Sequence, residues 1–307
     1  MVDINKKIFD FIQRKNICEI EDLINYDVMT NIVLSSTFPN FNDVVKRRFS
    51  LSNSFNLCYD FFSSLSKKYG NYFYGLLLDD TFILKHNDNC TENAMFYVDC
   101  DGTSQIFLPY CNTFCDCFTL AHEVIHSKNT FLNVSSFTRS YFSEFLSFFC
   151  EDLLGDYVCS KYSFECAFNK KNNFQLCYYR TLGVDFQVKL IMLFLNNGYV
   201  SDYDIKQLIL SYDFQYQSYI NDIYKMILND DISIDYDFRY LVGILLTCYV
   251  NENFSYKERK KLFLCLNDSV NQLTVPEFYS ILDLPFKLDC DSTKKLSSSY
   301  TKCLKKL

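Results

Sequence analysis

The sequence predicts a mainly α-helical protein that carries one small β-sheet. Two observations lead to this fold class. The chain of 307 residues contains only seven glycines and four prolines, which is few for a turn-rich β-sandwich or barrel. Apolar residues also recur at spacings of three and four over most of the chain, as they do in helices that bury one face.

The first two regions of the chain differ in their apolar pattern. Residues 1–80 are predicted to be helical, because segments such as FNLCYDFFSSLSKKYGNYFYGLLL keep the helical spacing. Residues 81–110 hold three short β-rich segments, TFILKH, AMFYVDC and SQIFLPY, separated by Asn, Asp and Gly clusters. These segments predict a small sheet of about three strands.

Helical spacing returns over residues 111–295, which are expected to form a helical core. Breaks are expected near residues 170–173, 197–198 and 229–231. Residues 296–307 are predicted to form a polar, loosely held tail. Because no linker is long enough to separate domains, the whole chain is expected to be one domain.

Composition argues against two classes of partner. The formal net charge is −7 and the lysines are spread out, so nucleic acid is not an expected partner. The longest apolar stretches, such as LIMLFL and LVGILLTCYV, are too short to span a membrane. The first segment, MVDINKKIFDFIQRKN, has charges among its apolar positions, unlike a signal peptide. We therefore expect a soluble, cytoplasmic protein of unknown oligomeric state.

The fifteen cysteines allow two interpretations. An oxidised secreted protein can be rich in cysteine, but here the number is odd and no export signal is present. We interpret them mainly as reduced, buried, small apolar residues. The cluster of Cys111, Cys115 and Cys117 looks like a metal site, but it lacks a C-x-x-C pair, and packing beside the next helix is the preferred interpretation.

Two of the three histidines lie in the segment CDCFTLAHEVIHSK. On a helix, His122 and His126 project from one face a turn apart, so both imidazoles can reach one ion. Glu123 is rotated by about 100° and would sit beside the ion, within reach of an activated water. This H-E-x-x-H spacing is typical of zinc peptidases. The alternative is an ordinary helix with two hydrogen-bonded structural histidines.

A catalytic zinc ion needs a third protein ligand and an open position. Residues 127–132 hold no third histidine, so a carboxylate must serve, and the next acidic residue downstream is Glu144. Glu144, Ser147 and Glu151 are spaced by three and four in RSYFSEFLSFFCEDLLGDYV, and therefore share one face of a predicted helix. Polar residues on such an apolar helix need partners, which a metal and its surroundings would supply. A solvated face is the alternative.

The segments DCFTLAHEVIHS and FSEFLSFFCEDLL together resemble the metal-binding region of the oligoendopeptidase F branch of the thimet-oligopeptidase family. There, D-x-F-T-L-A-H-E-x-G-H-S precedes a helix with E-x-x-S-x-x-x-E. IFLPYCNTFCD and YDFRYLVG are similar to the strand and turn before that motif and to the family's Tyr-rich helix. The resemblance spans about residues 55–250 and implies a gluzincin-like helical core with a small sheet beside the H-E-x-x-H helix.

Carried over position by position, the resemblance implies one zinc ion per chain, held by His122, His126 and Glu144. It implies Glu123 as the general base, with Ser147 and Glu151 in supporting positions. The implied activity is a zinc-dependent metallopeptidase that hydrolyses peptide bonds in short peptides, using zinc-activated water. Short peptides are therefore the expected partners.

The chain departs from the family's pattern in several places. Ile125 stands where the motif usually has glycine, and the connection from His126 to Glu144 is several residues shorter. The chain has about half the family's usual length and lacks its large N-terminal helical region. The family's substrate-binding histidine is missing from NDDISIDYDFRY, and the remaining histidine, His86, lies in the strand region.

The missing histidine leaves Tyr236 and Tyr240 as candidates to donate a hydrogen bond to the reaction's oxyanion. Tyr240 is the first choice, and core packing is the alternative role for either residue. Two other functions stay open. One is a non-catalytic or weakly active zinc- or peptide-binding relative of a peptidase, and the other is a zincin that acts on a folded protein.

Overall fold

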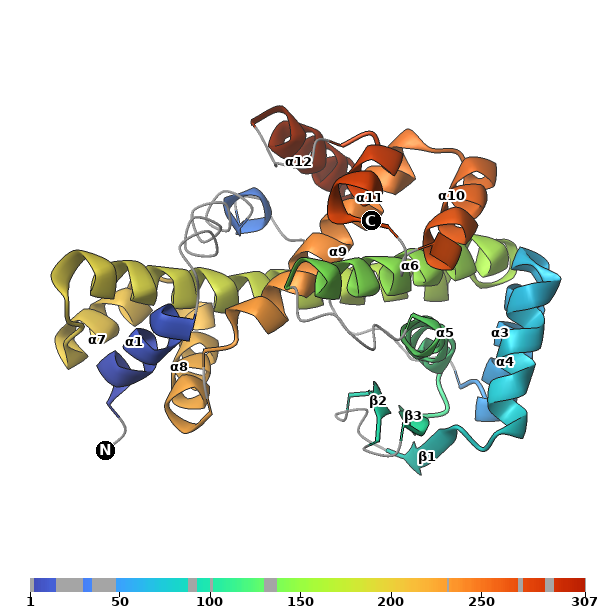
Figure 1. Cartoon of the computed structure of the whole chain (residues 1–307), viewed down its shortest axis with the longest axis horizontal. Coiled ribbons are helices and arrows are strands. Elements are labelled where there is room, and N and C mark those ends of the chain that lie inside the picture. The colour runs from blue at the N-terminus through green and yellow to red at the C-terminus, as the bar shows by residue number, and fades with distance from the viewer. Residues whose placement is uncertain are drawn as a thin grey trace.

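One long helical element organises the fold. In the computed structural model, α6 (Phe137–Asn197) runs through the middle of the molecule, and the other elements lie around it (Figure 1). The described residues are 3–14, 30–34, 48–87, 93–99, 102–129, 137–230, 232–269, 273–284 and 290–306. Most of them are helical and one small sheet accompanies the helices, so the predicted fold class is confirmed.

The element α6 is a helical hairpin rather than a single rod. Tyr162 has non-helical dihedral angles, φ −134° and ψ 43°. Beyond this bend the chain returns along itself, since the Cys166 thiol lies 3.3 Å from the Gly155 carbonyl oxygen. Farther from the bend, Asn173 donates a hydrogen bond to Glu151. The two arms of α6 therefore pack against each other in antiparallel directions.

The sheet forms where the sequence predicts it. Its strands are β1 (Phe82–His86), β2 (Met95–Val98) and β3 (Ser104–Tyr110), in the spatial order β1-β3-β2. The central strand β3 pairs in parallel with β1 and antiparallel with β2. Ile106 and Leu108 of β3 are fully buried, whereas β2 lies at an edge of the sheet.

The helix that carries the histidine pair, α5 (Cys115–Lys128), lies between the sheet and α6 (Figure 1). It contacts β2, β3 and α6. Leu120, Ala121 and Ile125 have no exposed surface. Burial on both sides fixes the helix, and the isoleucine at the usual glycine position is accommodated inside the core.

Two helices lie directly before the sheet in the chain. They are α3 (Leu51–Leu65) and α4 (Lys67–Leu78), which pack against each other, and α3 also contacts α5. Ser66 ends α3, and its hydroxyl accepts a hydrogen bond from the backbone N–H of Tyr69 in the first turn of α4. This N-cap lets the chain pass from one helix to the next through one residue.

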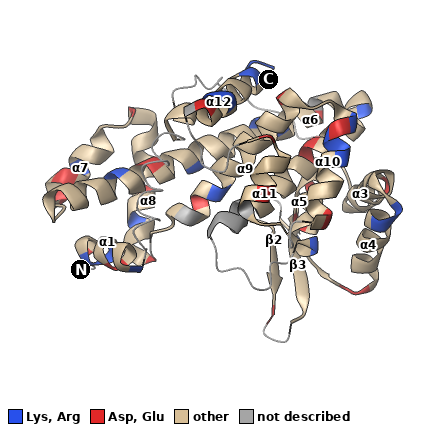
Figure 2. Ribbon diagram, turned by 45° about the horizontal axis from the view of Figure 1, so that its top comes forward, with Lys and Arg blue, Asp and Glu red and all other residues tan. Residues whose placement is uncertain are grey.

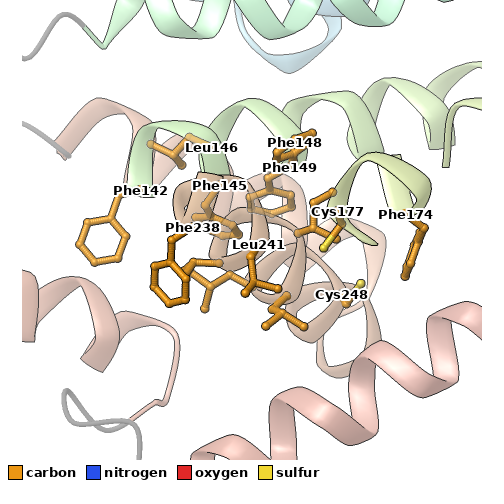
Figure 3. Close-up of a cluster of buried hydrophobic side chains, with 14 of the residues drawn as sticks. Phe142, Phe145, Leu146, Phe148, Phe149, Phe174, Cys177, Phe238, Leu241 and Cys248 are labelled. Atoms are coloured by element: carbon orange, nitrogen blue, oxygen red, sulfur yellow. The ribbon is translucent and has the colours of Figure 1, made fainter. Parts of the chain in front are cut away.

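An apolar cluster joins α6 to α9 (Ile234–Asn253). Figure 3 shows phenylalanines of α6 next to Phe238 of α9. Gly243 permits this close packing, because an added Cβ would lie 3.1 Å from the Phe145 backbone nitrogen and 3.2 Å from the Glu144 carbonyl carbon. The two helices therefore approach closely beside a predicted metal ligand.

The remaining helices lie along α6 in two groups (Figure 1). Those near its returning arm are α1 (Ile4–Arg14), α7 (Asp202–Leu210) and α8 (Phe214–Asn229) (Figure 1). Those on the side opposite the sheet are α10 (Tyr256–Ser269), α11 (Val275–Ile281) and α12 (Cys290–Lys305). Lysine, arginine and acidic residues are interspersed over the helices (Figure 2).

Two expectations about the second half of the chain are wrong. Residues 170–173 are helical rather than a break, because their polar side chains have partners, such as Asp152 for Lys170 at 2.9 Å. The predicted loose tail belongs instead to α12, which packs against α9 with Leu296 and Tyr300 buried. Two apolar side chains four positions apart give this polar helix a buried face.

The other two predicted breaks are present, since α6 ends at Asn197 and α8 ends at Asn229. Gly198 follows α6 with φ of 71°, a conformation that glycine adopts without strain. Among the described residues, no helix combines the length and the apolarity that crossing a membrane requires.

The described cysteines are mostly buried and not in disulfides, as the sequence predicts. Burial raises the pKa of the Cys58 and Cys150 thiols well above its usual value and that of Cys177 to about 12. These thiols therefore stay protonated and behave as small apolar groups. Cys111 is an exception because it is disulfide-bonded.

Candidate metal centre

The start of α5 is anchored in the loop that follows β3. The Asp116 carboxylate lies in the first turn of the helix and accepts hydrogen bonds from the backbone N–H groups of Cys111 and Thr113. A negative charge at this end also suits the helix dipole. The helix continues through the motif, so His122 and His126 lie one turn apart.

The Nε2 atoms of both histidines converge with the Glu144 carboxylate from α6. The Nε2 atoms of His122 and His126 are 3.0 Å apart. Glu144 Oε2 lies 3.4 Å from the first and 3.6 Å from the second. Tetrahedral zinc with bonds of about 2.0–2.2 Å separates its ligand atoms by about 3.3–3.6 Å. The two distances from Glu144 fall in this range, and the 3.0 Å between the two Nε2 atoms is about 0.3 Å shorter, so a zinc ion would need only a small separation of the imidazoles.

The donor set also fits zinc in its chemistry. His122 Nδ1 lies 2.7 Å from Glu151 Oε1, and His126 Nδ1 lies 2.8 Å from Ser143 Oγ. When Nδ1 carries the proton and donates, the Nε2 lone pair is left for a metal. Glu144 Oε2 is buried and has no hydrogen-bond partner, which is costly unless a cation is present.

Charges within the site favour ionised carboxylates. Burial alone would raise the pKa of Glu144, but His126 and His122 hold it well below its usual range. Burial would likewise lower the pKa of His122, but hydrogen bonds to Glu144 and Glu151 raise it well above its usual value. Glu144 therefore stays in the anionic form that binds a metal.

Residues of the returning arm of α6 form hydrogen bonds with Glu151. Its Oε2 accepts hydrogen bonds from Asn169 Nδ2 at 2.8 Å and Asn173 Nδ2 at 2.9 Å, while its Oε1 faces His122. The carboxylate is buried, so these three contacts fix its orientation. The bend at Tyr162 brings both asparagines to this position.

Ser147 shares the helix face of Glu144 and Glu151, as the sequence predicts, but it has a different partner. Its hydroxyl lies 3.2 Å from the backbone carbonyl oxygen of His122 and donates a hydrogen bond to it. The side chain is fully buried. Ser147 therefore ties α6 to α5 at the level of the first histidine.

Glu123 lies beside the three candidate metal ligands, in a pocket lined by all of them. Its side chain is buried and its Oε2 has no hydrogen-bond partner. Burial raises the pKa of this carboxyl, and the nearby His126 and His122 oppose the rise. An unpaired carboxylate oxygen next to metal ligands is suited to accept a proton from water.

Strand β2 and helix α9 both contribute residues to the pocket wall. Tyr236 and Tyr240 line it from α9, and their hydroxyls are 3.2 Å apart. Burial raises the pKa of Tyr240 well above its usual value, so its hydroxyl keeps its proton. Tyr236 is 44% exposed. The structure thus brings both predicted tyrosines to the site, whereas His86 does not line it.

Arg239 is the charged pocket residue, among the described residues, that sequence reasoning missed. Its Nε lies 3.2 Å from Glu144 Oε1. Its guanidinium lies 4.1 Å from the Tyr236 ring centre and 5.3 Å from that of Tyr240. The only signal in the sequence is its place between the two tyrosines, and arginines on helices are mostly solvent-facing.

Solved structures share this fold over nearly the whole chain. A Bacillus anthracis protein assigned as an oligoendopeptidase F matches 99% of this chain and 56% of its own, with a TM-score of 0.60 and 13% identity. Pz peptidase A, solved with an inhibitor, matches 95% of this chain and 59% of its own, with a TM-score of 0.64 and 12% identity. A Chlamydophila abortus protein assigned as a peptidase matches 99% and 55%, with a TM-score of 0.55 and 15% identity.

The chain spans a little over half of the length of these solved proteins. No family model and no curated protein sequence matches it. The likeness therefore rests on structure and shows the fold. It confirms the resemblance to oligoendopeptidase F at that level, as the motifs predict.

Proposed function

We propose that this protein is a zinc-dependent metallopeptidase that hydrolyses short peptides. The main support is the convergence of three potential ligand atoms, from His122, His126 and Glu144, at 3.0–3.6 Å from one another. This convergence occurs in a fold shared with Pz peptidase A and with proteins assigned as oligoendopeptidase F. One zinc ion per chain is proposed at these three residues.

Zinc, when bound, supplies a Lewis acid that polarises the scissile carbonyl and makes water more acidic. Glu123 accepts the proton of the attacking water and then passes it to the leaving amine, because its side chain lines the same pocket and its Oε2 has no hydrogen-bond partner. Tyr240, assisted by Tyr236, donates a hydrogen bond to the developing oxyanion. Glu151 keeps the His122 ring in its ligating orientation.

The edge strand β2 supports peptides as the substrate class. It has a neighbour on one side only within the described sheet, and its residues line the pocket beside the metal ligands. The free edge of a strand presents backbone N–H and C=O groups that an extended peptide can pair with. A peptide bound in this way passes the metal ligands with its backbone extended.

The test compares the wild type with Glu123→Gln. Both proteins should hold about one zinc ion by elemental analysis, whereas only the wild type should cleave a mixture of short peptides, measured by mass spectrometry. Glu258→Gln is a matched control, since Glu258 is exposed on α10 and outside the pocket, and it should behave as the wild type.

Unchanged hydrolysis in Glu123→Gln would rule out this mechanism. A wild type that holds zinc and binds peptides without cleaving them would instead support the non-catalytic alternative. Cleavage confined to folded proteins would support the second alternative, a zincin with a protein substrate.

A further inference from the structure

Arg239 is the single lysine or arginine among the described residues that line the metal pocket. Its side chain is 26% exposed, while its Nε atom is buried beside Glu144. The exposed part therefore lies elsewhere on the side chain. A permanent positive charge is thus present in the wall of the pocket that holds the metal ligands and Glu123.

The positive charge of Arg239 is only partly neutralised within the protein. Among the described residues, Glu144 is the carboxylate that pairs with Arg239, and the 3.2 Å contact is not aligned as a hydrogen bond. The other oxygen of Glu144 faces the two histidines, so a bound cation would share its charge. The Tyr240 side chain forms a hydrogen bond with Arg239. The rings of Tyr236 and Tyr240 also lie against the guanidinium, and these ring contacts leave its remaining N–H donors for another partner.

We propose that Arg239 binds a carboxylate of the substrate next to the scissile bond, so that the preferred peptides carry a negative charge there. This inference rests on the proposed function. A guanidinium presents five N–H donors in a planar fork that matches a carboxylate. A neutral peptide would leave the donors that Tyr240 does not use to water, and a cationic side chain at the same position would be repelled. The carboxylate comes either from the peptide's free C-terminus or from an aspartate or glutamate side chain.

Arg180 provides the contrast. It also lies over the Tyr236 and Tyr240 rings, at 5.3 Å and 5.1 Å from their centres. However, it donates a 2.6 Å hydrogen bond to Asp237 and does not line the metal pocket. Its charge is neutralised inside the protein. Arg180→Gln is therefore a matched control for Arg239→Gln.

The experiment measures kcat/KM for four peptides of one sequence. They combine a free or amidated C-terminus with glutamate or glutamine beside the scissile bond. In the wild type, at least one charged form should exceed its neutral counterpart about 10- to 100-fold, which is typical of a charge-assisted hydrogen bond. Arg239→Gln should abolish this preference and Arg180→Gln should keep it. The comparison that loses its preference in Arg239→Gln identifies the source of the carboxylate. It is the C-terminus if the free and amidated peptides become equal, and the side chain if the glutamate and glutamine peptides become equal.

Binding to the Glu123→Gln protein, measured by calorimetry, gives a readout without turnover. The charged peptides should bind more tightly there, and adding Arg239→Gln should remove the difference. Equal charged-to-neutral ratios in the wild type and Arg239→Gln would overturn the inference. So would an equal slowing of all four peptides with loss of zinc, because Arg239 would then act only through Glu144.

The two proposals fail in distinguishable ways. If the wild type cleaves no peptide but Glu123→Gln prefers the charged forms through Arg239, the hydrolytic function fails and the carboxylate site stands. If the wild type cleaves all four peptides equally, hydrolysis stands and the carboxylate site is overturned.

Discussion

Replacing Glu151 by glutamine tests how the metal centre is built, because this side chain acts only as an acceptor. Its Oε1 faces His122 Nδ1 at 2.7 Å, and its Oε2 accepts from Asn169 and Asn173 at 2.8 and 2.9 Å. A glutamine offers one acceptor oxygen and one NH₂ group. It can therefore accept either from His122 or from the two asparagines, but not from both.

Both orientations of the glutamine are costly. If its oxygen faces His122, its NH₂ group meets the two asparagine NH₂ groups, and buried donors lose their acceptor. If the amide is reversed, His122 Nδ1 must accept, and the ring proton moves to Nε2, which then cannot bind zinc. Loss of such an outer partner typically lowers metal affinity about 10- to 100-fold, or roughly 1.4–2.8 kcal/mol.

The assay is competition for zinc against a chelator, with folding checked by circular dichroism. Asp152→Asn is the matched control, because Asp152 is the next residue and is also buried. It pairs with Lys170 and Arg259 instead of a histidine, so its loss should lower stability without changing zinc affinity. Equal zinc affinity in the wild type and Glu151→Gln would refute this reasoning.

Three further changes probe the ligand, the oxyanion donor and the helix contact. Glu144→Gln should weaken zinc binding more than Glu151→Gln, because it replaces a ligand; the reverse order by the same competition assay would make Glu151 the ligand. Tyr240→Phe should lower kcat about 100-fold with KM little changed. Wild-type kcat in Tyr240→Phe, in Tyr236→Phe and in the double variant would exclude both hydroxyls as oxyanion donors. Gly243→Ala should destabilise the fold by about 1–2 kcal/mol in denaturant unfolding, since the clash with α6 outweighs the gain in helix propensity; increased stability would show that the helices can separate.

The sequence by itself determined the parts of the site that depend on local geometry. His122, Glu123 and His126 lie within little more than one helical turn, so their relative directions follow from the helix repeat alone. Glu144, Ser147 and Glu151 share a helix face for the same reason. The three strands follow from short β-rich segments between turn residues, and the structure places them there. The catalytic roles of Glu123 and the tyrosines stay predictions.

Only the tertiary structure decided which distant groups meet. The bend at Tyr162 interrupts an apolar pattern that continues on both sides, so nothing local shows that Asn169 and Asn173 return to Glu151. The docking of α12 on α9 likewise depends on a surface that another helix provides. Arg239 reaches Glu144 because α9 packs tightly against α6 at Gly243. Such contacts join residues far apart in the chain, and helical periodicity says which face a residue occupies but not what lies opposite it.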